Sequence, residues 1–270
     1  MAKKILFINQ EITPYVPENA VSNTGQLLPQ KAQEAGCEIR TFTPKWGTIN
    51  ERKGQLHEVI RLSGMNLVID EIDHSLIIKV ASIPVTRLQV YFIDNDDYFN
   101  SRKMAADEQG KEYEDNGERA IFYARGVLET VKKLRWTPDI IVCQGWISAV
   151  VPLFVKTAYK EEPSFSESKV ITTLYGNQLK GSLGDNFKQC LPYRDATAEL
   201  LAGYADQFDF AELNKLAIDY SDGIIAGDGD VSPETLDYAK SKGVPTLNYP
   251  GKDNVEACLE FIQRTCGEKE

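Results

Sequence analysis

Lys4-Ile-Leu-Phe-Ile8 is a continuous apolar run near the start of the sequence. A short run that does not alternate with polar residues is typical of a strand buried on both faces, as in a parallel sheet. A loop with Pro14 and Pro17 follows, and the pattern then predicts a helix over Ser22–Ala35 and a strand over Glu38–Phe42. The opening of the chain therefore predicts a strand, a helix and a second strand.

The same alternation returns in the second half of the sequence. Apolar runs predict strands at Asp139–Cys143, Lys169–Leu174, Gly223–Ala226 and Pro245–Asn248, and apolar spacing predicts helices at Asn116–Leu134, Trp146–Tyr159, Leu213–Tyr220, Pro233–Ser241 and Asn254–Arg264. Alternating strands and helices form parallel sheets with right-handed crossovers. We therefore predict an α/β fold built on a Rossmann-like parallel sheet. Pro29 is expected to kink or divide the first helix because proline lacks an N–H.

The stretch from residue 56 to residue 93 has a different character. It contains short β-rich segments, at Leu56–Leu62, Leu67–Asp70, Leu76–Ser82 and Gln89–Ile93. Gly64, Asp73 and Pro84 separate them, as turn residues separate the strands of hairpins. The sequence has no internal repeat, no low-complexity tract and no long linker. We expect one domain over residues 1–270, with a β-hairpin insertion at about 56–93.

The charge balance of the chain limits its partners. Lys and Arg number 30 against 40 Asp and Glu, which gives a formal net charge of −10. An acidic surface repels phosphate backbones and anionic lipids, so neither nucleic acid nor a membrane surface is an expected partner. No apolar run is long enough for a signal peptide or a membrane-spanning helix. We therefore expect a cytoplasmic protein.

The sequence offers no recognisable metal centre. Zinc sites need closely spaced Cys and His ligands, and this chain has no Cys-x-x-Cys pair and only two histidines, His57 and His74. We expect no metal and no cofactor, and we expect both histidines to be surface or structural residues. The five thiols are expected to be reduced and mostly structural; they belong to Cys37, Cys143, Cys190, Cys258 and Cys266.

The loops after the predicted strands are the places to search for a site. Ligands of open α/β sheets bind at the carboxyl ends of the strands, here after Ile8, Cys143, Leu174 and Ala226. The first of these loops, residues 9–25, has neither Gly-x-Gly-x-x-Gly nor P-loop spacing, so a polar surface loop is favoured over a phosphate cradle. No nucleophile and no acid–base pair stands out. We therefore predict no catalytic residue.

Two acidic segments suit either a cation or a turn, and the first of them, with the aromatic rings of Tyr98 and Phe99, also suits a sugar-binding rim. Asp94-Asn-Asp-Asp97 and Asp228-Gly-Asp230 carry the carboxylates that hard cations prefer. We favour turns for both: the first as a solvated turn that caps the next helix, the second as a Gly-rich turn before Ser232-Pro233, a helix N-cap followed by proline at N1. Trp146 directly follows a predicted strand, and we favour a packing role over a ligand platform.

Several motifs occur in the order and spacing of one known family. They are Glu11–Tyr15 followed by Leu28-Pro29, then Val90–Phe99, Tyr113–Phe122, Pro138–Pro152 and Asn214–Asp222. Together they resemble the N-terminal half of bacterial glycogen and starch synthases, whose Tyr-x-Asp-Asn-x-Glu-Arg motif matches Tyr113–Arg119. The resemblance implies one half of the GT-B glycosyltransferase fold. It also implies that the C-terminal domain, which binds most of the ADP-glucose, is absent.

The chain departs from this family where the resemblance places contacts to the nucleotide sugar. Pro17 stands where the family has a lysine, and Asn19 and Ala20 stand where it has two glycines. Gln144 replaces the histidine of His-x-Trp, and Leu174 replaces that of Thr-Ile-His-Asn. Proline offers neither a charge nor an N–H, and a Cβ at a former glycine restricts close backbone approach.

Three functions are open to such a chain. The first is a catalytically degenerate relative of glycogen synthase that acts by binding α-glucan or a partner. The second is an active ADP-glucose-dependent α-1,4-glucan glucosyltransferase, completed by a C-terminal domain in trans. The third is an unrelated nucleotide-binding Rossmann protein. A homodimer or a partner glycosyltransferase is expected to cover the face that relatives turn toward their cleft.

We favour the first function, so independent transferase activity is not expected. Amide side chains can both donate to and accept from sugar hydroxyls, and aromatic rings offer flat apolar faces to a pyranose. The residues that we predict to bind substrate, α-glucan or ADP-glucose, are Tyr15, Asn19, Asn23, Gln144, Trp146, Tyr175 and Asn177.

Overall fold

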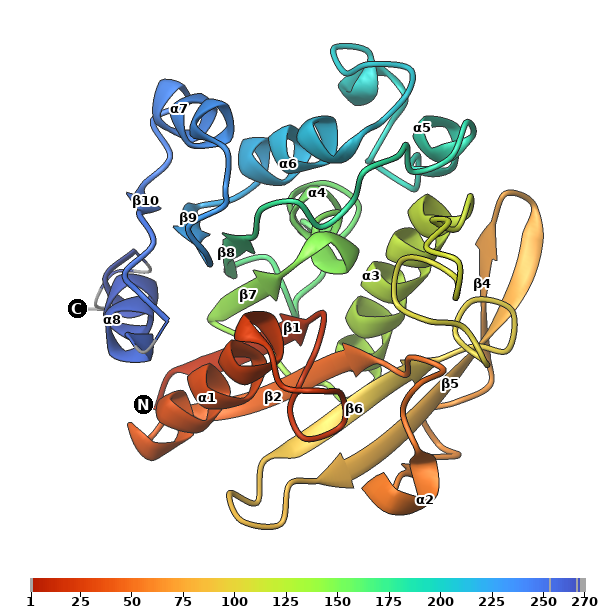
Figure 1. Ribbon diagram of the computed structural model, residues 1–270, viewed down its shortest axis with the longest axis vertical. Helices are drawn as coiled ribbons and strands as arrows, with labels where there is room; N and C mark the ends of the chain where they lie inside the picture. Colours follow the sequence, from red (N-terminus) through yellow and green to blue (C-terminus); the bar gives the residue numbers. More distant parts are fainter. Residues whose placement is uncertain (1, 253, 266, 268–270) are drawn as a thin grey trace.

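The computed structural model describes residues 2–252, 254–265 and 267 (Figure 1). The strands are β1 (Lys4–Asn9), β2 (Glu38–Pro44), β3 (His57–Glu58), β4 (Met65–Ile69), β5 (Ile72–Ser82), β6 (Gln89–Asp94), β7 (Ile140–Gln144), β8 (Lys169–Leu174), β9 (Gly223–Ala226) and β10 (Thr246–Leu247). The α-helices are α1 (Ala20–Glu34), α2 (Glu51–Gly54), α3 (Asn116–Lys133), α4 (Val151–Lys156), α5 (Phe187–Cys190), α6 (Phe210–Asp219), α7 (Pro233–Ser241) and α8 (Val255–Thr265). Two 3-10 helices, η1 (Trp146–Ser148) and η2 (Glu199–Leu201), complete the described elements.

The strands form a mostly parallel sheet. Its order is β10-β9-β8-β7-β1-β2-β6-β5-β3, and β4 pairs with β5. Neighbours from β10 to β6 run parallel, whereas β3, β4 and β6 each pair antiparallel with β5. The chain first builds the sheet outward from β1 to β2 and β6, then returns to the other side of β1 with β7. The boundary between β1 and β7 is therefore a topological switch point, the place where α/β proteins bind ligands.

Helices cover both faces of the parallel part of the sheet. On one face α1 and α8 lie side by side (Figure 1), and Leu28 of α1 and Phe261 of α8 pack in one core with Phe7 of β1. On the other face α3, α4 and α6 contribute to the larger core, which includes Ile121 and Phe154. Each fully buried side chain of this size stabilises the fold by about 1.5–3 kcal/mol, so continuous apolar strands need helices on both sides.

The predicted fold class is confirmed, but several local predictions are wrong. Helix α1 is one helix with Pro29 inside it, so the predicted division is wrong, while the alternative of a kink stays a prediction. The helix predicted over Trp146–Tyr159 is instead a 3-10 turn followed by the short α4. Within the predicted β segment Leu56–Leu62, only His57 and Glu58 form a strand. Strand β6, which we placed in the insertion, pairs with β2 in the parallel part of the sheet.

Two further observations concern the predicted absence of a membrane-spanning helix and the predicted state of the thiols. No helix of the described residues is long and apolar enough to cross a membrane. Cys37, Cys143, Cys190 and Cys258 are free thiols, and burial raises the pKa of the Cys143 thiol. The fifth cysteine, Cys266, lies outside the described residues.

Candidate functional site

Strands β1, β7 and β8 end at one edge of the sheet, beside the switch point. Asn9 of β1 pairs with Gln144 of β7, and Gln144 pairs with Thr173 of β8. The loops that leave these strands therefore meet at this edge, together with the start of α1. We call the polar side chains gathered there the strand-end cluster: Gln10, Glu11, Gln144 and Gln178, which are buried or half-buried, and Asn19, which is exposed.

Gln10 connects three of these segments. Its Oε1 accepts hydrogen bonds from the backbone N–H of Trp146 at 3.1 Å and from Nε2 of Gln178 at 3.2 Å. Its Nε2 donates to Oε1 of Glu11 at 2.9 Å. Oε1 of Gln178 also accepts from the N–H of Trp146, at 2.9 Å. The amides at this edge are thus bonded to neighbouring parts of the chain.

Gln144 is buried at the end of β7, with 3% of its surface exposed. Its Nε2 donates to the hydroxyl of Tyr175 at 2.7 Å and to the carbonyl of Val21 at 3.2 Å. Its Oε1 has no hydrogen-bond partner among the described residues and lies against Gly25 of α1. A Cβ at Gly25 would overlap the carbonyl oxygen of Glu11, so only glycine lets α1 approach this closely.

The first loop closes on itself at the start of α1. Oδ1 of Asn19 accepts from the N–H of Ser22 at 2.9 Å, and Oγ of Ser22 accepts from the N–H of Asn19 at 2.9 Å. This capping box satisfies two backbone donors at the helix start. Nδ2 of Asn19 donates to the carboxylate of Glu11 at 2.6 Å, and Thr13 donates to Oδ1 of Asn23 at 3.0 Å. The first loop is therefore held by its own side chains.

Two hollows near the strand ends and the first loop differ in size. A cavity of about 30 Å³ lies between α1 and the ends of β8 and β9, lined in part by Thr24, Thr173 and Tyr249. Such a volume holds about one water molecule, whereas small-molecule pockets usually measure about 300–1,000 Å³. A larger hollow of about 540 Å³ lies between residues 14–17 of the first loop and residues 48–55. We call it the loop–α2 groove.

The structure brings only part of the predicted site together. Gln144 and Tyr175 are bonded to each other, and Asn19, the N-cap of α1, and Asn23, in the first turn of α1, lie beside the first loop. The rings of Trp146 and Tyr175 are only 2% and 1% exposed, so neither presents a face to a ligand in this structure. Trp146 packs near Trp46, with ring centroids 6.5 Å apart.

The other two predicted site residues lie elsewhere. Tyr15 is half-buried in the loop–α2 groove, edge-on to Phe92 at 4.8 Å between ring centroids. Asn177 is exposed after β8, with φ at 54°, and its side chain makes no hydrogen bond in the described part of the chain. Gln10 and Gln178 belong to the cluster, but sequence reasoning missed them. A polar residue directly after a buried strand is the only signal that marks Gln10.

Asp228 holds a turn, as we favoured from the sequence. Its carboxylate accepts from the N–H of Gly176 at 3.0 and 3.1 Å and from the N–H of Asp230 at 3.0 Å. Ser232 is the N-cap of α7 and Pro233 follows at its start, as predicted. Among the described residues no group of three or more His, Cys, Asp or Glu side chains is placed to hold a metal ion.

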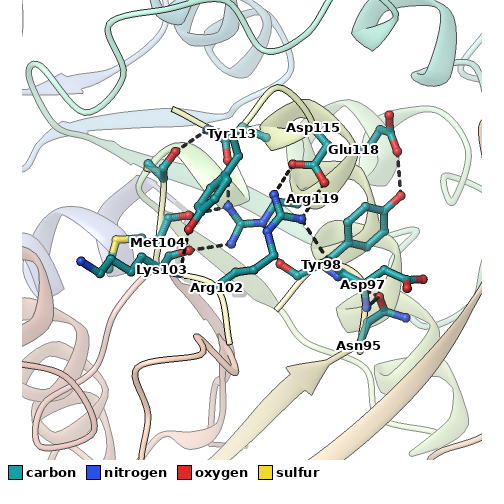
Figure 2. Close-up of polar contacts among 12 residues, drawn as sticks. Asn95, Asp97, Tyr98, Arg102, Lys103, Met104, Tyr113, Asp115, Glu118 and Arg119 are labelled. Carbon is teal, nitrogen blue, oxygen red and sulfur yellow. Dashed lines mark hydrogen bonds and ion pairs between the residues drawn. The ribbon is translucent and has the colours of Figure 1, made fainter. Parts of the chain in front are cut away.

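The Asp94–Asp97 segment also forms a turn, but it caps no helix. Oδ1 of Asn95 accepts from the N–H groups of Asp97 and Tyr98 at 2.9 and 3.1 Å (Figure 2). The next helix, α3, begins only at Asn116, so the prediction of a helix cap is wrong. Asp94 is bonded to Lys79 at 2.8 Å, and His74 bonds Asp97 and Tyr98 at 3.1 and 3.0 Å. These side chains therefore join strands and loops within the fold.

A second buried polar group, centred on Arg119 of α3, involves the Tyr-x-Asp-Asn-x-Glu-Arg motif (Figure 2). Arg119 is fully buried, and its guanidinium donates to the carbonyls of Tyr98, Lys103 and Met104 at 2.7–2.9 Å. It also donates to Oδ1 of Asn116 at 2.8 Å. We call these five residues the Arg119 cluster.

Neighbouring motif residues support the same loop. Asp115 forms a two-bond ion pair with Arg102, at 2.5 and 2.7 Å, and the Arg102 guanidinium lies 4.3 Å from the ring centre of Tyr113. Glu118 accepts from the hydroxyl of Tyr98 at 2.8 Å. The motif thus fixes the loop of residues 95–105 onto α3, which is a structural role.

The fold and its switch-point edge define a class of protein, the α/β proteins built on a Rossmann-like parallel sheet. The chain belongs to the starch synthase catalytic domain family, whose model matches residues 4–243. It is similar to glycogen synthases of Chlorobium species. Identity is 36% over 202 residues with that of Chlorobium limicola (74% of this chain, 41% of the relative) and 33% over 262 residues with that of Chlorobium phaeobacteroides (96% and 53%).

A solved structure shares the fold. The catalytic domain of Starch Synthase IV from Arabidopsis thaliana, bound to ADP and acarbose, superposes with a TM-score of 0.71 at 16% identity. The superposition covers 92% of this chain and 51% of that one. The chain thus spans about half the length of the relatives it matches.

Proposed function

We propose that this chain acts in α-glucan metabolism by binding glucan, and that it does not transfer glucose from ADP-glucose on its own. The observation that carries the proposal is the closed strand-end cluster. Gln144, at the position that the family resemblance assigns to a histidine, is buried and bonded to Tyr175 and Val21. A side chain held in this way is not available to a transferred sugar.

The first loop supports the same proposal. A diphosphate is usually bound by positive side chains and by free N–H groups at a helix start. Here Pro17 supplies no charge, and the Asn19 side chain occupies the N–H of Ser22. Leu174, at the second position where the resemblance expects histidine, is 3% exposed and packs in the apolar core around β9. The nearby cavity of about 30 Å³ has no room for a nucleotide.

Glucan is the ligand that the relatives suggest. They are glycogen synthases, and the structural neighbour was solved with acarbose as well as ADP. A chain that keeps the fold while its nucleotide-side contacts are replaced would keep the affinity for the polymer rather than for the donor. Binding is expected to be weak, with a Kd of about 1 mM, because few contacts offset the cost of ordering the ligand.

A second candidate function is an active glucosyltransferase completed in trans. It is favoured by family membership and by the match to about half the length of the relatives. Positive side chains of a second domain would stabilise the leaving diphosphate, which is usually a large catalytic term. Under either of these two candidate functions, we expect a homodimer or a partner glycosyltransferase to cover the strand-end edge.

Transfer of radiolabelled glucose from ADP-glucose to glycogen tests both functions. The purified chain alone should give no transfer above background, while maltohexaose shifts its backbone amide resonances. Transfer by the isolated chain would overturn the first function. Transfer only after adding a separately expressed C-terminal domain from a Chlorobium glycogen synthase would establish the second. Light scattering on the same samples would report the oligomeric state.

A further inference from the structure

We propose that the α-glucan is bound in the loop–α2 groove, and not at the strand ends. The inference rests on the proposed function, because it names where that ligand is held. The groove measures about 540 Å³, within the range of about 300–1,000 Å³ that is usual for small-molecule sites. The first loop contributes to both places: its residues 14–17 line the groove, and its Glu11 belongs to the strand-end cluster.

The charge of the groove favours a neutral ligand. Its twelve lining residues include no carboxylate, although the chain as a whole carries a net charge of −10. The adjacent carboxylate of Glu51 bonds Lys45 and Lys79 at 2.9 and 2.7 Å, which lowers its pKa. Lys53 is the single cation of the lining and is exposed, so it provides little of what a diphosphate requires. An uncharged polyhydroxyl compound fits this lining better than an anion.

The polar groups of the groove have free hydrogen-bonding capacity. Within the part of the chain that the structure describes, the side chains of Thr48, Lys53, Gln55 and Ser82 make no hydrogen bond or ion pair. The strand-end cluster differs in part, because most of its amide groups are bonded to side chains or to the backbone, and Oε1 of Gln144 is the exception noted above. Sugar hydroxyls need both donors and acceptors, which hydroxyl and amide side chains supply.

Tyr15 provides an aromatic wall for the groove. Its ring is edge-on to Phe92, and a Cβ at Gly54 would stand 3.2–3.3 Å from two of its ring carbons, so the first loop and α2 meet at this ring. Burial raises the pKa of the Tyr15 phenol to about 12, so the hydroxyl stays protonated at neutral pH. The hydroxyl has no hydrogen-bond partner among the described residues. Ring and hydroxyl together suit a pyranose with its alternating apolar and polar surfaces.

Two exposed amides allow a matched test. Gln55 lines the groove and Asn177 lies at the strand ends, and both have φ of 54°, so glycine fits either backbone. Calorimetric titration with maltohexaose should show Gln55→Gly binding about three- to tenfold more weakly than the wild type, the usual effect of losing a hydrogen bond. Asn177→Gly should bind like the wild type. Tyr15→Ala should reduce binding at least as much, and Tyr15→Phe, which keeps the ring, should retain most of it.

The outcomes separate the location from the function. If maltohexaose binds the wild type and Asn177→Gly weakens binding while Gln55→Gly and Tyr15→Ala do not, the groove is the wrong place and the proposed function stands. If ADP or ADP-glucose binds and maltohexaose does not, both the groove and the glucan function are overturned. If maltohexaose binds neither the wild type nor any variant, both are likewise overturned. A circular dichroism melt of each variant checks that Tyr15→Ala is folded.

Discussion

The Arg119 cluster and the strand-end cluster are both networks of polar groups, but the first carries information about the fold and the second about the chemistry. Arg119 donates only to carbonyls and an amide of its own domain, so its motif residues hold the loop of residues 95–105 on α3. The strand-end cluster lies where ligands of α/β sheets bind. Here the chain keeps the family motif at the first region and departs from it at the second. Resemblance in the first region therefore reports the fold, and only the second region reports the chemistry.

The largest effect is expected from Arg119→Met. The substitution leaves three backbone carbonyls and Oδ1 of Asn116 without their donor inside the core. Stranded buried polar groups of this kind should destabilise the fold by about 3–5 kcal/mol, as measured by urea unfolding.

Arg102→Gln is the matched control for Arg119→Met. Arg102 is partly exposed and pairs with Asp115, so its loss should cost about 1 kcal/mol. Equal losses for the two arginines would contradict the structural role that we assign to the Arg119 cluster. Burial lowers the pKa of Arg119 to about 9, which still leaves it charged at neutral pH.

A smaller loss is expected from Gly25→Ala. The new Cβ would overlap the carbonyl oxygen of Glu11, so α1 must move away from the strand-end cluster. Overpacking of a well-packed site costs about 1–3 kcal/mol, which thermal unfolding would detect. Gly203→Ala is the control, since a Cβ there meets no atom within 4 Å. A Gly25→Ala variant as stable as Gly203→Ala would mean that the edge is looser than the structure describes.

An effect as small as that of Arg102→Gln should come from Gln144→His, which restores the family residue at the strand ends. The imidazole gives up at least one of the two hydrogen bonds of Nε2, to Tyr175 and Val21, so stability should fall by about 1 kcal/mol. Glucose transfer should remain at background, because the first loop is unchanged. Measurable transfer by this single variant would show that one side chain, rather than the whole edge, separates the chain from its active relatives.

Much of the fold could be predicted from periodicity alone. Runs such as Lys4–Ile8 have no polar alternation, and strands buried on both faces require that pattern. The helix over Trp146–Tyr159 was overpredicted. Pro152 has no N–H to donate within a helix and favours its first turn, so a 3-10 turn precedes the short α4, which begins at Val151. The proline was visible in the sequence and could have moved the boundary.

The candidate site was harder to predict, for a physical reason. Gln10 and Gln178 are 168 positions apart, and no local pattern indicates that their amides meet. Whether Trp146 faces a ligand or the core depends on Trp46, which the sequence does not place beside it. Residue type therefore selected polar and aromatic candidates at strand ends, whereas burial decides which of them can contact a ligand.

The cap of α1 has a consequence for the evolution of this chain. Asn19 serves two partners at once, the N–H of Ser22 and the carboxylate of Glu11. A mutation to glycine would release the helix start for a phosphate, but it would also leave the mostly buried Glu11 carboxylate with one donor fewer. The first step back toward a nucleotide-sugar site therefore lowers stability before any activity is gained.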